Sequence, residues 1–71
     1  MGNYYCVNNN WTLNPGLHHE VHTDWHAQQL GITSKINLGY CYDEVEAVAR
    51  AKQYYSDADG CAICCPKAHK G

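Results

Sequence analysis

The chain has 71 residues, 45% of them hydrophobic, and carries five lysines and arginines against seven aspartates and glutamates. A chain of this length forms one domain, residues 1–71, whose core supplies no more than about 3–5 kcal/mol, so a metal, disulfides or a partner is expected to add stability. The net charge of −2 disfavours a nucleic-acid binder, because such proteins neutralise phosphates with a basic stripe.

No targeting segment is recognisable in the sequence. It has no apolar run long enough to cross a membrane, and MGNYYCVNNN has neither the basic start nor the apolar stretch of an export signal. We therefore expect a cytoplasmic location with reduced thiols. The odd number of cysteines, five, also disfavours a framework made only of disulfides.

The first half of the chain predicts one strand and one ambiguous segment. Residues 4–8, YYCVN, favour a strand that ends at the turn-prone NNN, and NPG at 14–16 predicts a second turn. Residues 17–31 fit no single element. Leu17, Val21 and Trp25 recur every four residues, and Asp24 is a suitable cap for a short helix through WHAQQL that ends at Gly31.

The second half has clearer patterns. Residues 35–42 alternate as a half-buried strand whose apolar face comprises Ile36, Leu38, Tyr40 and Tyr42. Residues 43–55 predict the main helix, with Asp43 as N-cap and Glu46 as the return half of a capping box. We expect its buried stripe to comprise Val45, Val48, Ala49 and Tyr55. Its expected exposed residues are Glu44, Glu46, Arg50 and Gln53.

The segment after the helix predicts irregular structure. SDADG is expected to form a loop in which Gly60 takes a left-handed conformation, followed by a turn and a short helix over 64–70. The predicted fold is a small α+β domain, in which short β-strands pack on one main helix (about 43–55) and a knuckle near the C-terminal end staples the chain.

Cys61 and Cys64 form a C-x-x-C unit directly after Gly60. This spacing suits zinc, because a tight turn brings both thiolates onto one face of a tetrahedron. The alternative, a redox dithiol, normally opens a helix after a thioredoxin-like strand, whereas this unit follows a helix and a loop. One C-x-x-C unit supplies half of a structural site, so two more ligands are required.

The second pair of ligands is predicted at His22 and His26, in HTDWH. Side chains four apart project the same way on one helical turn, and the spacing fits equally a loop followed by the start of the Asp24-capped turn. Two thiolates and two neutral imidazoles neutralise Zn²⁺ and suit a partly buried structural site. The alternative is that both histidines are solvated surface residues, but five histidines beside a C-x-x-C unit favour a metal.

The order of these blocks resembles a group of small, uncharacterised bacterial Cys- and His-rich proteins. The resemblance is carried by YYCVNNN, HHEVH, LGYCYDEVEAVARAK and GCAICC followed by a histidine, and it covers most of the chain. The group's pattern runs YYVN, HEVH followed by a Cys, LG with C..AV..A, and GC..CC..CH. More loosely, the arrangement is similar to the Ada-type zinc-binding fold.

Two departures from that pattern bear on the ligands. His26 stands where the group has a cysteine, which keeps a zinc ligand, and Ala68 stands in place of its last cysteine, so that position is no ligand here. Cys65 and His69, at i and i+4, are the reserve ligands. Cys6 and Cys41 are expected to be small core residues of the strands.

Catalytic interpretations of these residues are weaker. HHEVH lacks the zincin spacing, because Glu20 lies between histidines three apart, and a Cys65–His69 pair has no third group to orient it. We expect no enzymatic activity. Glu20 is expected to cap a helix or to support a ligand histidine from outside the coordination sphere.

The predicted function is structural zinc binding in a module that binds a macromolecule, with a protein favoured over nucleic acid by the acidic balance. The alternatives are a thiol- or metal-handling protein and a single-stranded nucleic-acid binder. Six tyrosines and two tryptophans exceed what so small a core can bury, so several should be exposed and available as interface anchors.

Overall fold

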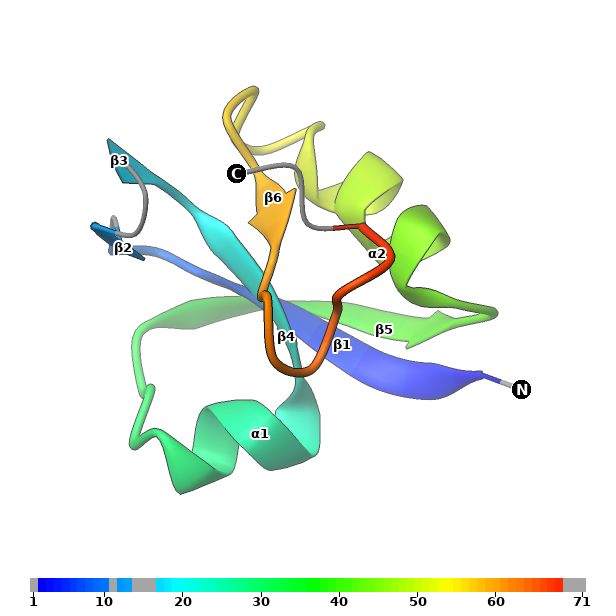
Figure 1. Cartoon of the computed structure of the whole chain (residues 1–71), viewed down its shortest axis with the longest axis horizontal. Helices are drawn as coiled ribbons and strands as arrows, with labels where there is room; N and C mark the ends of the chain where they lie inside the picture. Colours follow the sequence, from blue (N-terminus) through cyan, green and yellow to red (C-terminus); the bar gives the residue numbers. More distant parts are fainter. Residues whose placement is uncertain (1, 11, 14–16, 69–71) are drawn as a thin grey trace.

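A four-stranded sheet organises the chain (Figure 1), which a computed structural model describes over residues 2–10, 12–13 and 17–68. The strands lie in the order β5-β1-β4-β6, with bounds β1 Asn3–Asn8, β4 Glu20–Thr23, β5 Lys35–Cys41 and β6 Asp59–Gly60. β1 is antiparallel to β4 and β5, whereas β6 is parallel to β4. The helices are α1, Asp24–Gln29, and α2, Glu44–Ala51. The predicted small α+β class is confirmed.

A separate two-stranded antiparallel ribbon is formed by β2, Thr12–Leu13, and β3, Leu17–His18. The turn predicted at 14–16 lies outside the described residues, as do Trp11 and His69. Within the described ranges, neither helix has the length and apolar character needed to span a lipid bilayer.

Strand alternation divides the side chains of β1 and β4 between two faces of the sheet. Tyr5, Val7 and Val21 belong to the core that packs against α2. Cys6 and His22 are opposite each other in the β1–β4 register and point to the other face, where α1 lies. Both side chains are buried, so this second face has an interior of its own, with a polar group inside it.

The short helix α1 follows β4 without a loop. Its N-cap is Thr23, whose hydroxyl accepts a hydrogen bond from the His26 N–H at 3.2 Å, so the prediction that Asp24 caps the helix is wrong by one residue. The predicted end at Gly31 is correct. Gly31 has a φ of 72°, and the Gly31 and Ile32 N–H groups return to the carbonyls of Gln28 and Ala27, which is a Schellman motif.

A β-bulge changes which residues of β5 are buried. Tyr5 of β1 pairs with Gly39, but the next residue, Cys6, pairs with Asn37, so β5 has one extra residue at this point. The bulge depends on Gly39, whose φ is 80°. The predicted apolar face is therefore wrong beyond Leu38, since Cys41 is buried while Tyr40 and Tyr42 are exposed.

The main helix, α2, begins as predicted. The Asp43 carboxylate accepts a hydrogen bond from the Glu46 N–H at 2.9 Å, and the Glu46 carboxylate accepts one from the N–H of Tyr42 rather than that of Asp43. The predicted buried stripe is confirmed at Val48 and Tyr55 and wrong at Val45 and Ala49, which are exposed. Glu44, expected to be exposed, is half-buried. The buried residues of α2 are Ala47, Val48 and Ala51.

The helix ends at Ala51 rather than near residue 55. Turns follow it, in which the Tyr54 and Tyr55 N–H groups donate to the Ala51 carbonyl, and Tyr55 makes contacts with distant residues. The Tyr55 hydroxyl donates to Asn9 at 2.7 Å, and its ring stacks on His19 with the centroids 3.7 Å apart. His19 in turn contacts the Asp57 carboxylate at 2.7 Å. These contacts join the loop after α2 to β1 and to the start of β4.

The C-terminal segment also differs from the prediction. Residues 64–68 form turns instead of a helix, and β6 was not predicted. Gly60 is not left-handed. It is required for space instead, because a Cβ at Gly60 would lie 2.8 Å from the Cys65 carbonyl oxygen and 3.0 Å from Ala68.

Candidate metal centre

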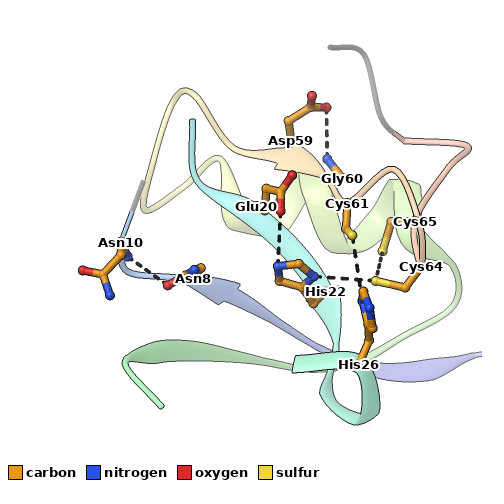
Figure 2. Close-up of polar contacts among 10 residues, drawn as sticks. All are labelled: Asn8, Asn10, Glu20, His22, His26, Asp59, Gly60, Cys61, Cys64 and Cys65. Atoms are coloured by element: carbon orange, nitrogen blue, oxygen red, sulfur yellow. Dashed lines mark hydrogen bonds and ion pairs between the residues drawn. The ribbon is translucent and has the colours of Figure 1, made fainter. Parts of the chain in front are cut away.

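Four side chains from three parts of the chain converge on one point (Figure 2). His22 comes from β4 and His26 from α1, and Cys61 and Cys64 come from the turn after β6. One donor atom of each lies within 4.8 Å of the donor atoms of the other three. The structure thus brings together the four residues that the sequence predicted as ligands, and their arrangement is able to hold a metal ion.

The spacing of the donor atoms fits a tetrahedral ion. The Cys61 sulfur is 3.8 Å from Nδ1 of His26, and the Cys64 sulfur is 3.7 Å from Nδ1 of His22. Metal–sulfur bonds of about 2.3 Å and metal–nitrogen bonds of about 2.0–2.1 Å place sulfur and nitrogen about 3.6 Å apart along a tetrahedral edge. These two separations are close to that value, and the four donor atoms together lie within 4.8 Å of one another.

The end of β4 positions the two histidines. Strand alternation directs His22 away from the α2 core, and the Thr23 cap then starts α1, so that His26 lies in the first helical turn. The two rings are 5.5 Å apart and inclined at 64°. The alternative that places both histidines on one helical turn is wrong. The other alternative, a loop followed by the start of a capped turn, is closer to the structure, in which the strand β4 takes the place of the loop.

The pairing of β6 with β4 positions the two cysteines. The Cys61 N–H donates to the Val21 carbonyl at 3.0 Å, directly beside His22. The Cys65 N–H donates to the Cys61 carbonyl at 2.8 Å, which closes the turn that contains Cys64. Cys61 is thus held directly by the strand that carries His22, and Cys64 is held through the turn that the Cys65 N–H closes.

The two thiol ligands have opposite electrostatic environments. A hydrogen bond from Cys65, together with contacts to His22, the Thr23 N–H and His26, lowers the pKa of the Cys64 thiol well below its ordinary value. Burial raises the pKa of the Cys61 thiol. The surroundings thus favour the thiolate at Cys64 and the protonated thiol at Cys61, and a metal held by both sulfurs would displace the Cys61 proton.

Cys65 is a neighbour of the site rather than one of the four converging residues. Its side chain is fully buried in the core that contacts α2, and its sulfur is 3.8 Å from that of Cys64. The contact with Cys64 and burial raise the pKa of Cys65, which favours its protonated thiol form. The other reserve ligand, His69, lies outside the described residues.

Cys6 and Cys41 are both fully buried in the strands, as predicted for small core residues. Burial and the nearby Asp24 carboxylate raise the pKa of Cys6 to about 12, and burial raises that of Cys41. Neither belongs to the converging group. Both are inert thiols at neutral pH.

Glu20 lies behind His22. One oxygen of this buried carboxylate is 3.5 Å from Nε2 of His22, while Nδ1 of the same ring faces the Cys64 sulfur. Histidines that bind metals usually donate their other ring N–H to a carboxylate, which fixes the tautomer. Because Glu20 is in β4, it caps no helix, and the geometry agrees with the expected role outside the coordination sphere.

Comparisons of the chain with protein-family models, with curated proteins and with solved structures find no significant match. The resemblance to small bacterial Cys- and His-rich proteins therefore stays a hypothesis. The fold and the geometry of the site define the chain as a small α+β protein with a His₂Cys₂ group able to hold a metal ion.

Substitution of a proposed ligand should remove the metal. We expect Cys61→Ser, Cys64→Ser, His22→Ala and His26→Ala each to reduce bound zinc from one ion per chain to nearly none, as measured by elemental analysis of the purified protein. The matched control is Cys41→Ser, which should lower stability but retain one zinc. Loss of zinc in the control alone, with His22→Ala still loaded, would show that the ligands are misassigned.

Substitution of Glu20 should weaken the site without abolishing it. We expect Glu20→Gln to reduce zinc affinity by about 10- to 100-fold, the usual effect of removing a carboxylate behind a ligand histidine. Competition with a chromogenic chelator measures this change, with Asp57→Asn as a carboxylate control on another histidine. Equal losses in the two variants would contradict a specific role for Glu20.

Proposed function

We propose that this chain is a small zinc-binding protein, that its Cys₂His₂ site is structural, and that the zinc-stabilised domain binds a protein partner. The convergence of the four donor groups carries the proposal. His26 and Cys61 are 35 residues apart, and His22 and Cys64 are 42 apart. An ion held by all four would join β4, α1 and the C-terminal turn, so it would restrict much of the chain.

The donor set supports zinc in particular. Two sulfur and two imidazole donors in a tetrahedral arrangement are typical of structural zinc, whereas magnesium and calcium require oxygen ligands. Four protein ligands also complete the tetrahedron. A catalytic zinc needs an open position for water or substrate, so we propose that the protein is not an enzyme. The requirement for reduced thiols fits a cytoplasmic location.

Exposed aromatic side chains support a binding role. Tyr4 and Tyr40 are cross-strand neighbours whose rings meet edge to face at 5.4 Å, and they are 58% and 55% exposed. Trp25, Tyr42 and Tyr54 are exposed as well. Tyrosine and tryptophan are the residues that most often anchor protein interfaces. The acidic balance of the chain favours a protein over a nucleic acid as the partner.

A second candidate function is metal handling. His26 and Cys64 are only half-buried, and the additional thiol of Cys65 lies next to Cys64. A site in which two of the four ligands are only half-buried is suited to exchanging its metal. The two functions differ in the number of ions bound per chain and in how readily those ions exchange.

Removal of zinc should unfold the domain. Structural zinc contributes an apparent free energy of about 10–16 kcal/mol, which exceeds the stability of about 3–5 kcal/mol that so small a core provides. We expect a strong chelator to abolish the cooperative thermal transition and to collapse the amide dispersion in ¹H–¹⁵N spectra. Restored zinc, at one ion per chain, should recover both.

Two results would contradict this expectation. A chelated chain that keeps its native spectrum and melting transition would remove zinc from the explanation of the fold. Several weak, rapidly exchanging ions per chain would favour metal handling over a structural site.

Single-stranded nucleic acid should not bind. Stacking on the exposed tyrosines would need accompanying phosphate contacts, and the chain has only five lysines and arginines. We expect fluorescence anisotropy of labelled DNA and RNA oligonucleotides to show no change at physiological salt. A micromolar affinity that falls steeply with added salt would make nucleic acid the preferred partner.

A further inference from the structure

A largely apolar groove of about 210 Å³ lies between α2 and the C-terminal turn. Its apolar lining consists of Val45, Val48, Ala49 and Ala68, and its charged lining of Lys52, Asp59 and Lys67. The volume is below the roughly 300–1,000 Å³ typical of small-molecule sites. The groove therefore accommodates a side chain of a partner rather than a cofactor.

The groove results from the way α2 packs. The buried stripe, Ala47, Val48 and Ala51, faces the sheet, so Val45 and Ala49 remain on the outer side of the helix. The C-terminal turn, red in Figure 1, stands beside this side of α2, and the Lys67 N–H donates to the Glu44 carboxylate at 3.3 Å. Apolar side chains are thus exposed between two walls, with Val45 56% exposed.

The charges that line the groove are unusual for this chain. Of the basic side chains in the described residues, Arg50 donates to Glu46 and to the Leu38 carbonyl, and Lys35 donates to the Ile32 carbonyl. The ammonium groups of Lys52 and Lys67 have no acceptor within the described ranges, and both line the groove. Asp59 is the one carboxylate of the lining, and it accepts a hydrogen bond from the Gly60 N–H. The Glu44 carboxylate also stands at the edge of the groove, where it accepts the Lys67 N–H. The two ammonium groups are therefore the charges of this surface that are available to the carboxylates of a partner.

We propose that the groove binds an acidic peptide segment of a protein partner. One apolar side chain of the segment enters between α2 and the turn, and its flanking carboxylates meet Lys52 and Lys67. Apolar burial supplies the affinity, and the complementary charge selects acidic segments over basic ones. This inference rests on the protein-binding part of the proposed function and names the class of partner.

Selection from a random peptide library displayed on phage, against the full-length zinc-loaded protein, tests the proposal. We expect the enriched peptides to share an aliphatic or aromatic residue flanked by Asp or Glu. An enriched peptide should bind the double variant Lys52→Glu/Lys67→Glu at least 10-fold more weakly than it binds the original protein. The matched control is Lys35→Glu, which should bind the peptide with unchanged affinity. Its amide shift changes should lie on α2 and on residues 67–68.

Several results would overturn the proposal. One is that the library yields no enriched peptide, or that its enriched peptides share a basic or uncharged sequence. Another is that the amide shift changes centre on Tyr4 and Tyr40 instead of α2. A dimer of the protein that Lys52→Glu dissociates would make a second copy of the chain the occupant of the groove. Zinc content is measured on the same samples. If the protein holds one zinc per chain but enriches no acidic peptide, the proposal for the groove is wrong and the structural zinc site stands. If a folded, metal-free chain enriches acidic peptides, the structural role of zinc is wrong and the proposal for the groove stands.

Discussion

The hydrogen bond from the Cys61 N–H to the Val21 carbonyl is the contact on which the rest of the site depends. It adds β6 to the sheet beside β4, and it sets the C-x-x-C turn next to the strand residue that precedes His22. The Thr23 cap then starts α1 so that His26 reaches the same point from the other side. Four donors from three segments meet because two short strands and one capped turn place them there, before any metal contributes.

The site is supported from outside by two groups that are not among its four donors. Glu20 faces Nε2 of His22, and the Cys65 sulfur is 3.8 Å from that of Cys64. Such contacts fix the histidine tautomer and stabilise a thiolate, so they prepare the donors for a cation. They also connect the two faces of the sheet, because Cys65 belongs to the core under α2 whereas His22 lies on the opposite face.

The small interior explains why a metal would matter so much. Among the described residues, His22 is the largest side chain that is fully buried. A buried imidazole without partners costs stability, whereas a coordinated one contributes to it. The same shortage of core leaves aromatic and aliphatic side chains outside, on the β1–β5 surface and in the groove beside α2. These are the surfaces that the protein offers to a partner.

Local chemistry was sufficient for much of this structure. The Asp43 cap, the end of α1 at Gly31, the strand over residues 4–8 and the four converging residues were all predictable, because caps, turns and ligand spacings depend on a few neighbouring side chains. The sequence did not predict the face of β5 beyond Gly39, the contacts of Tyr55 after α2 or the packing role of Gly60. These depend on a bulge register, on contacts of Tyr55 with His19 and Asn9, and on the approach of the Cys65 carbonyl. Such contacts join residues distant along the chain, so only the tertiary structure decides them.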